Sequence, residues 1–197
     1  MTDSPAPPEY PYVALEQLQR QEAAPPAEPP DFRTIFERES SYVWNSLRRL
    51  GVPESDLEDL THDVLLTVHR RLADYDTSRP LRPWLFGISV RTASRFRQLA
   101  RHRREVMDDR VEAADERPAA DSLIESRQAS ELVIDALGAL DLDRKAVLVM
   151  HDIDGSAMPE IAAVLGIPLN TAYSRLRLAR VDFKRAVQRL RLKRGAP

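Results

Sequence analysis

The sequence predicts an all-α fold made of two small helical domains joined by a flexible acidic linker. Apolar residues recur at three- and four-residue steps in both halves, which is the spacing of amphipathic helices. Glycine and proline divide these runs into separate segments. With 43% hydrophobic residues among 197, the chain can build real cores. We expect the domains at residues 31–104 and 131–194, with the linker at 105–130.

The first thirty residues are rich in proline. Residues 1–30 contain eight of the fifteen prolines, in pairs such as Pro25-Pro26 and Pro29-Pro30. This composition is typical of extended or disordered chain, so we predict a disordered tail. Order should begin near Asp31, a plausible helix N-cap.

A first helix, or two helices with a break, should follow Asp31 and end at Gly51 and Pro53. Its apolar positions are Phe32, Ile35, Phe36, Val43, Leu47 and Leu50. Ser55 and Glu58 have the spacing of a capping box, which predicts the start of a second helix. Its apolar face comprises Leu57, Leu60, Val64, Val68 and Leu72.

The outer face of this second helix is acidic. It carries Asp56, Asp59, His62 and Asp63. The i, i+3, i+4 spacing of Asp59, His62 and Asp63 is geometrically conceivable for a metal ion, but nothing on such a face excludes water. We therefore expect no metal there, and a docking surface for a basic or mixed partner groove.

A stiff loop with two prolines is expected from Ala73 to Pro83, followed by a long helix to about residue 104. The apolar stripe of that helix is Trp84, Ile88, Thr92, Phe96 and Leu99. Tyr75 and Phe86 are better placed to contact something outside. Arginines interleaved with aromatic rings suit single-stranded DNA, because guanidinium groups follow the backbone while bases stack on rings.

Charge is segregated along the chain, although the net charge is only −2. Residues 79–104 hold eight arginines and no acid, and residues 170–194 hold nine Lys or Arg against one Asp. Between them, residues 105–143 hold twelve acids against three arginines. Two basic blocks separated by an acidic one indicate two nucleic-acid surfaces and a connector that stays off the phosphates.

The second half should begin with helices near 131–140 and 146–150, followed by a turn at Asp154-Gly155. The stretch from Met158 to Arg180 has a helix-turn-helix pattern, in which Gly166 ends one helix and Pro168 can start the next. The second of these helices presents Asn170, Thr171, Tyr173, Ser174, Arg175 and Arg177. Such groups can reach base edges and phosphates in a major groove, although an ordinary packed hairpin can show the same pattern.

Several classes of protein are disfavoured by composition. The chain has no cysteine, so disulfides and Cys-based zinc sites are ruled out. It has no apolar run of membrane-spanning length and no signal-peptide pattern at its start, so we expect a cytoplasmic protein without membrane insertion. A nucleophile-base pair, a phosphate-binding glycine loop and a metal cluster are also missing, which indicates a protein that is not an enzyme and needs no cofactor.

With both halves laid out, the chain resembles the extracytoplasmic-function (ECF) sigma factors of the sigma-70 family. The resemblance covers roughly residues 32–104 and 131–190. In the first half it rests on DLEDLTHDVLLTV, Trp84-Leu85 and Ile88. In the second half it rests on Leu140, Arg144, Gly155, Glu160-Ile161-Ala162, Leu165-Gly166, Thr171, Ser174-Arg175 and Ala179-Arg180.

The resemblance implies a promoter-specificity subunit with three binding surfaces. Core RNA polymerase, through its β′ clamp helices and β flap, is the implied partner, and Asp56, Asp59, His62 and Asp63 fall on the clamp-helix face. The residues implied at the melted minus-ten element are Tyr75, Arg79, Arg82, Trp84, Phe86, Arg91 and Arg95. Those implied at the minus-thirty-five duplex are Asn170, Thr171, Tyr173, Ser174, Arg175, Arg177 and Arg180. An anti-sigma factor is a further expected partner.

Two other functions remain open from the residues. A free-standing repressor or activator would read an operator through the helix-turn-helix alone. An all-helical interaction adaptor would have no role on DNA, and its nucleic-acid affinity would respond little to salt. Arg91 and Arg95 fall where the family usually has Asn and Asp or Asn, so base specificity does not carry over to them.

Overall fold

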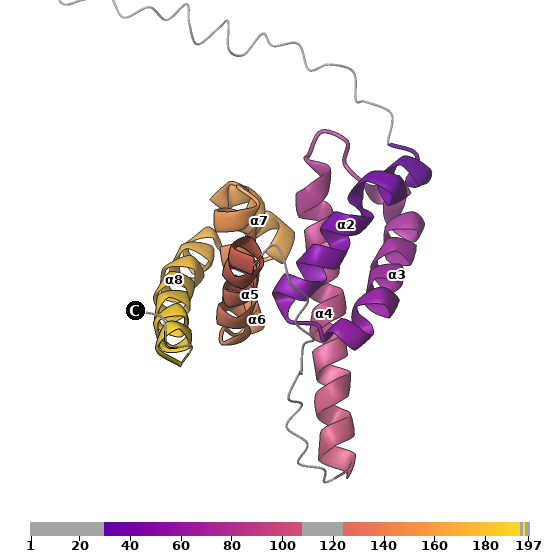
Figure 1. The fold of residues 1–197 in the computed structure, drawn as a ribbon. Helices are drawn as coiled ribbons and strands as arrows, with labels where there is room; N and C mark the ends of the chain where they lie inside the picture. The colour runs from indigo at the N-terminus through magenta and orange to yellow at the C-terminus, as the bar shows by residue number, and fades with distance from the viewer. Residues whose placement is uncertain (1–29, 108–123, 194, 196–197) are drawn as a thin grey trace, which may run out of the picture.

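The computed structural model describes residues 30–107, 124–193 and 195, and no strand occurs among them. The first helix group comprises α2 (Phe32–Leu50), α3 (Glu54–Arg71) and α4 (Leu81–Met107). The second helix group comprises α5 (Ile124–Gly138), α6 (Leu142–Leu148), α7 (Met158–Leu165) and α8 (Leu169–Lys193). The two groups lie side by side (Figure 1), which confirms the predicted all-α fold in two helical parts. The tail up to residue 29 and linker residues 108–123 lie outside the described residues.

Helix α2 is one continuous helix and ends where glycine permits it. Gly51 has φ 87° and ψ 34°, the left-handed conformation that suits glycine at a helix end. The Val52 amide donates to the Leu47 carbonyl at 3.1 Å, which satisfies one of the last carbonyls of the helix. Asp31 stands at the predicted N-cap position, but its side chain forms no capping hydrogen bond. Phe36, predicted to be apolar core, is 45% exposed.

Helix α3 has the predicted apolar face, but the predicted capping box does not form. Leu57, Val64 and Val68 are fully buried. The helix begins at Glu54 after Pro53, so Ser55 lies inside the first turn and not at the cap. The Ser55 hydroxyl donates instead to Asp56 Oδ2 at 2.9 Å. The capping-box prediction is therefore wrong, although the position of the helix is right.

Helix α4 corrects the prediction for Phe86. This ring is fully buried and cannot contact DNA from outside the fold. The buried side of α4 is wider than a single stripe, because the helix packs on both α2 and α3. Leu99, predicted to lie in the apolar stripe, is 52% exposed near the end of α4 that extends beyond its neighbours (Figure 1).

In the second helix group, α5 begins at Ile124, seven residues before the predicted start at Glu131. Helix α6 continues into one π-helical turn, Val149–Ile153, before the predicted turn at Asp154-Gly155. Gly155 has φ 73°, which suits glycine at this turn. No helix in the described part of the chain is both long enough and apolar enough to cross a bilayer.

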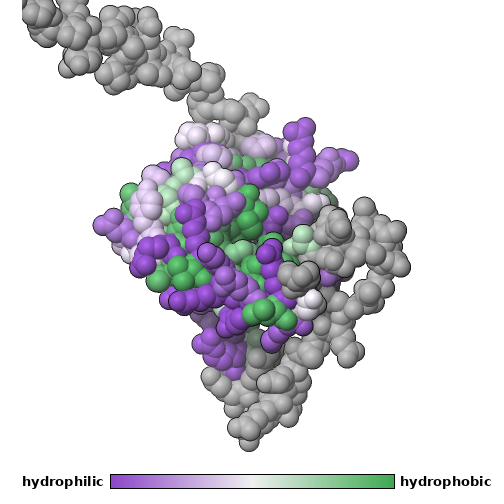
Figure 2. All heavy atoms as spheres, turned by 60° about the vertical axis from the view of Figure 1, so that its left-hand side comes forward, coloured by the Kyte–Doolittle hydropathy of each residue, from purple (hydrophilic) through white to green (hydrophobic). Residues whose placement is uncertain are grey.

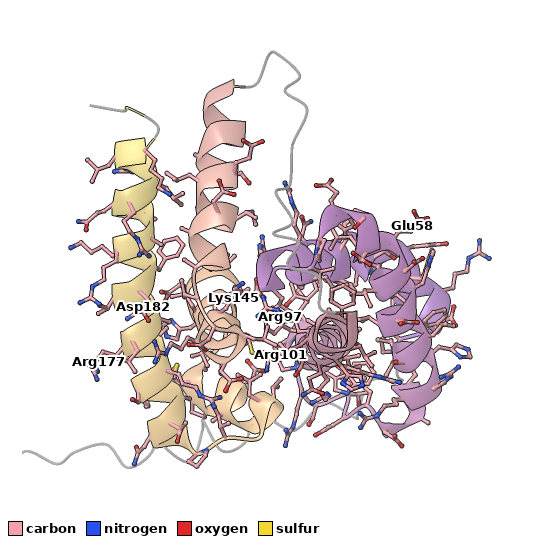
Figure 3. The ribbon with its side chains drawn as sticks, turned by 90° about the horizontal axis from the view of Figure 1, so that it is seen from below. Glu58, Arg97, Arg101, Lys145, Arg177 and Asp182 are labelled. Carbon is pink, nitrogen blue, oxygen red and sulfur yellow. The ribbon has the colours of Figure 1, made fainter. Side chains whose placement is uncertain are left out.

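The two helix groups share one hydrophobic core and several polar contacts. Buried side chains from α2, α4, α6 and α7 form a continuous cluster. Lys145 of α6 is fully buried and lies between the groups, near Arg97 of α4 (Figure 3). The Asp154 carboxylate accepts a hydrogen bond from Tyr42 of α2 at 2.7 Å. None of these contacts has a signal in local sequence, since each joins residues far apart in the chain.

Candidate nucleic-acid interface

Helices α7 and α8 form the predicted helix-turn-helix. Gly166 ends α7 with φ 65° and ψ 38°, and the Ile167 amide donates to the Ala162 carbonyl at 3.0 Å. This is the hydrogen bond that closes a Schellman-type helix end. Ile161 of α7 and Ala172 of α8 are fully buried, so small and branched apolar groups hold the two helices together. Helix α8 then continues for 25 residues as a rod along the second helix group.

One face of α8 is exposed at helical spacing. It carries Asn170, Tyr173, Ser174 and Arg177, at i, i+3, i+4 and i+7. The Arg177 side chain points away from the rest of the molecule (Figure 3). The side turned forward in Figure 2 is mainly hydrophilic with separate hydrophobic spots, a surface suited to a polar partner.

The other three predicted residues of α8 have different surroundings. Thr171 and Arg175 are half-buried. Arg175 Nη2 pairs with Asp143 of α6 at 2.6 Å. Arg180 donates from Nε and Nη2 to the two carboxylate oxygens of Asp152, at 2.9 and 2.6 Å, and these hydrogen bonds hold the pKa of Asp152 below its usual value. Both arginines are thus oriented by acids of the α6 region.

The loop between α3 and α4 is ordered by Asp76. Its carboxylate accepts hydrogen bonds from the amide and the hydroxyl of Ser78, at 3.0 and 2.6 Å, and pairs with Arg79 at 3.1 Å. The Ser78 hydrogen bonds are the main cause of the lowered pKa of Asp76. The Tyr75 hydroxyl donates to the Arg79 carbonyl at 2.5 Å. The loop is therefore held in one conformation by its own hydrogen bonds and an ion pair, in keeping with the stiffness predicted from its prolines.

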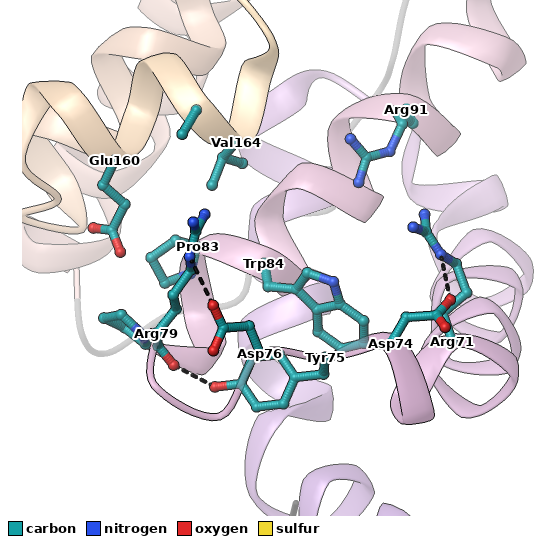
Figure 4. Close-up of a pocket in the computed structure, with 12 residues that line it drawn as sticks. Arg71, Asp74, Tyr75, Asp76, Arg79, Pro83, Trp84, Arg91, Glu160 and Val164 are labelled. Atoms are coloured by element: carbon teal, nitrogen blue, oxygen red, sulfur yellow. Dashed lines mark hydrogen bonds and ion pairs between the residues drawn. The ribbon is translucent and has the colours of Figure 1, made fainter. Parts of the chain in front are cut away.

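A pocket of about 390 Å³ opens beside this loop (Figure 4). The Tyr75 and Trp84 rings lie at its floor, with their centroids 5.0 Å apart. Arg71 and Arg91 line one side, and Arg71 approaches Asp74 at 3.9 Å. Across the pocket, helix α7 contributes Glu160, Ala163 and Val164. The lining thus combines two aromatic rings, which suit stacking with an unstacked base, with three arginines, of which Arg71 and Arg79 are paired with Asp74 and Asp76.

The remaining predicted residues of the first helix group lie elsewhere. Arg82 pairs with Glu39 at 2.9 Å and lies over the Tyr42 ring at 5.1 Å from its centroid. Arg95 lines a separate groove between α3 and α4, together with the exposed Leu66 and Leu99. The seven residues predicted for single-stranded DNA are therefore not one surface: Tyr75, Arg79, Trp84 and Arg91 meet at the pocket, and Phe86 is inside the core.

On α3, Asp59, His62 and Asp63 are exposed on one face, while Asp56 is half-buried. Within the described residues, no three His, Cys, Asp or Glu side chains are grouped closely enough to hold a metal ion. The face therefore presents two exposed carboxylates and one imidazole on a helix whose opposite side is buried.

Comparison with known proteins agrees with this architecture. The family model for sigma-70 region 2 matches residues 35–105, and the model for sigma-70 region 4 matches residues 130–183. The RNA polymerase sigma factor CnrH of Cupriavidus metallidurans is 31% identical over 160 residues, which cover 76% of this chain and 82% of that one. The ECF RNA polymerase sigma-E factor of Escherichia coli K12 is 26% identical over 148 residues, 71% of this chain and 78% of that one.

Solved structures show the same fold. CnrH in complex with the cytosolic domain of CnrY superposes with a TM-score of 0.57 at 28% identity, over 80% of this chain and 87% of that one. The sigma factor RpoE of Bartonella quintana, in complex with the anti-sigma factor NepR, superposes with a TM-score of 0.62 at 21% identity, over 80% of this chain and 97% of that one.

The helix-turn-helix of α7 and α8 and the match of the same part of the chain to sigma-70 region 4 define a DNA-binding transcription factor. The second match, of residues 35–105 to sigma-70 region 2, identifies it as a sigma factor. The chain belongs to the ECF group of the sigma-70 family. It is a specificity factor for transcription initiation, and the alternative of a free-standing repressor or activator is not favoured.

Proposed function

We propose that the exposed acidic face of α3 is the surface that binds core RNA polymerase. Asp59, His62 and Asp63 project from a helix whose opposite side is fully buried, so their positions are fixed by the core. A rigid row of carboxylates suits a basic or mixed groove, as the β′ clamp helices offer. Asp56 lies at the start of the same face, and the second helix group is assigned to the β flap.

The pocket beside the loop is assigned to the melted minus-ten strand. Tyr75 and Trp84 offer stacking surface, and Arg79 and Arg91 offer charge at the rim. A stacked base is worth about 1–3 kcal/mol, so one or two captured bases offset much of the cost of opening the duplex. Arg82 and Arg95 are assigned to the backbone of the same strand on either side of the pocket.

The exposed face of α8 is assigned to the minus-thirty-five duplex. The single observation that carries the overall assignment is this stripe of Asn170, Tyr173, Ser174 and Arg177 on the second helix of a well-formed helix-turn-helix. These side chains have the reach and hydrogen-bonding groups for base edges. Thr171, Arg175 and Arg180 are assigned to the edges of the same contact, once DNA competes with their acidic partners.

The proposal also covers the location, the regulatory partner and the domain limits of the factor. The factor acts in the cytoplasm, has no catalytic activity of its own and uses no cofactor. An anti-sigma factor is a proposed partner, supported by the similarity to CnrH, which has been solved with the cytosolic domain of CnrY. The boundaries at residues 31–104 and 131–194 and the linker at 105–130 stand as proposed domain limits.

Run-off transcription with core polymerase on genomic promoter fragments tests the proposal. Transcripts that start at defined promoters only when both proteins are present are the expected result. Binding of the same fragments should be tight and specific with core polymerase and weak without it. Tight, specific binding by the lone protein would contradict the sigma assignment and would instead favour a free-standing repressor or activator.

A further inference from the structure

One side of the pocket beside the α3–α4 loop carries positive charge that the nearby acids do not fully compensate. On the other side, Arg79 pairs with Asp76 at 3.1 Å (Figure 4). Arg71 approaches Asp74 only at 3.9 Å, and both side chains of this pair are exposed, so the pair contributes little. Arg91 has no acidic partner among the described residues. The wall that holds Arg71 and Arg91 is therefore the cationic side of the pocket.

The backbone of α4 leaves space for the Arg91 guanidinium beside the aromatic floor. Trp84, Gly87 and Arg91 occupy positions i, i+3 and i+7, which share one face of the helix. A Cβ atom on Gly87 would lie 3.4 Å from Arg91 Nη2. A larger side chain at this position would stand between the Trp84 ring and the guanidinium. Arg91 thus reaches back along α4 toward the stacking surface.

The side chains of Arg71 and Arg91 meet on this wall from two helices, α3 and α4. Loss of water around Arg91 and then the nearby Arg71 cation lower the pKa of Arg91, so the two like charges repel each other. An anion placed between them would relieve this repulsion. A phosphate suits the place, because its oxygens accept paired hydrogen bonds from planar guanidinium groups. The edge of a base offers acceptors but no negative charge to offset two cations.

We propose that Arg71 and Arg91 form a phosphate site, through which the pocket holds one nucleotide of the minus-ten strand by its stacked ring and its backbone, and not by the identity of its base. The inference rests on the proposed function of the pocket. A volume of about 390 Å³ suits a single nucleotide. Every base has a face that can stack and every nucleotide has a phosphate, so such a site accepts any base. Arg91 then fixes the position of the strand and leaves base selection to other contacts.

The test uses the full chain bound to core polymerase and a labelled single-stranded minus-ten oligonucleotide, with fluorescence anisotropy as the measurement. Each phosphate is replaced in turn by a methylphosphonate, which keeps the linkage but removes its negative charge. Arg91→Gln removes the charge of the side chain, and Arg91→Lys keeps it. Arg38→Gln is the matched control, because Arg38 is an exposed arginine of α2 that does not line the pocket. Circular dichroism checks that helix content is the same in all variants.

Arg91→Gln should weaken binding about tenfold, the effect of losing a hydrogen bond to a charged group. At one linkage, the methylphosphonate should weaken binding to the unmodified protein but add no further loss in Arg91→Gln. The slope of log affinity against log salt should become shallower by about 0.7, the value for one phosphate of a single strand. Arg91→Lys should keep this slope and the sensitivity of that linkage. Arg38→Gln should change neither, and the preference among the four bases should be the same in all variants.

Asp74→Asn gives an independent measurement on Arg71. It removes the acid that approaches Arg71 and should therefore strengthen binding of the unmodified strand. The gain should disappear with the strand that carries a methylphosphonate at the linkage found with Arg91→Gln. A gain that persists with this strand would exclude Arg71 from the phosphate site.

Losses that add at every linkage would overturn the phosphate site. A changed base preference with an unchanged salt slope would also overturn it, because Arg91 would then read the edge of a base. Failure of the underlying function has a different result: the unmodified complex would not prefer the minus-ten strand to a random strand, and Tyr75→Ala would not weaken binding. A failed phosphate site would leave that preference and the effect of Tyr75→Ala intact.

Discussion

The Nζ atom of Lys145 lies 3.3 Å from the carbonyl oxygen of Leu50, although the two residues are 95 positions apart. Lys145 is fully buried between the helix groups. Burial and, to a smaller extent, the nearby Arg97 cation lower the pKa of Lys145 to about 8, and Asp141 opposes both effects. Protonation of this one side chain is therefore linked to the closeness of the two groups.

The first prediction is that the folded protein gains stability as the pH rises from about 8 to about 10. Below pH 8 Lys145 is protonated both when buried and when exposed, so the full cost of burying a cation is present. Between the buried pKa of about 8 and the ordinary value of 10.5, only the exposed form keeps the proton. The difference between the two pKa values corresponds to on the order of 3 kcal/mol of unfolding free energy, which is an upper limit. Urea unfolding at several pH values can measure the actual gain.

Two comparisons test the cause. Lys145→Met should remove the rise in stability over this range, because the methionine side chain does not titrate. Above pH 10 the trend should reverse, since burial and the hydrogen bond to Asp154 hold the pKa of Tyr42 well above its ordinary value. The unfolded chain then loses a proton that the folded chain keeps. A flat profile in the unmodified protein would argue against a buried Lys145.

The outlines of the helices could be predicted because their signals are local. The residues that predict the apolar face of α3 and the glycine-ended α7 lie close together in the sequence. The sequence predicts the start of α5 seven residues too late, because the first two turns of the helix are polar and lack periodicity. The apolar pattern predicts the wrong side of α4 for Phe86, since a helix packed on two neighbours buries more than one stripe.

The contacts between the helix groups could not be predicted from the sequence. Lys145 directly follows Asp143 and Arg144, so the sequence reads it as part of a charged, exposed turn, and its acceptor is set only by the tertiary fold. Likewise, the sequence predicts only a turn at Asp154, whereas its carboxylate also accepts a hydrogen bond from the Tyr42 hydroxyl. The exposed stripe of α8 is predictable because its side chains share one helix, but the ion pair of Arg175 with Asp143 depends on the packing of α6 against α8.

A second prediction concerns the acidic face of α3. Reversing charge at Asp59 and Asp63 should impair assembly with core polymerase while leaving helix content intact, because both side chains are exposed and only the surface potential changes. Glu37→Lys on α2, another exposed acid, is the control. Gel filtration or fluorescence anisotropy with core polymerase measures assembly. Unchanged assembly of the reversed variant would remove this partner assignment.

A third prediction separates the ring of Tyr75 from its hydroxyl. Tyr75→Ala should weaken binding of a minus-ten oligonucleotide to the polymerase-bound factor by about 1–3 kcal/mol, the value of one stacked base. Tyr75→Phe keeps the ring near Trp84 and should cost much less. Fluorescence anisotropy with the labelled strand gives both affinities. Equal losses in the two variants would show that the hydroxyl contact to the Arg79 carbonyl, and not stacking, shapes the pocket.

The last prediction distinguishes two arginines of α8. Arg177→Ala should weaken binding of minus-thirty-five duplex by about 1–3 kcal/mol and relax sequence preference if the side chain reads a base. Arg175→Ala should have the same kind of effect but a smaller one, because Arg175 must first leave Asp143, which it pairs with at 2.6 Å.

Asp143→Ala frees Arg175 and should strengthen duplex binding. Lys184→Ala, farther along α8, is the control and should not strengthen it. Binding is measured on promoter and random duplexes over a range of salt concentrations. An equal loss on both duplexes with a shallower salt dependence would make Arg177 a phosphate contact. No loss on either would remove the exposed α8 stripe as the promoter-reading surface.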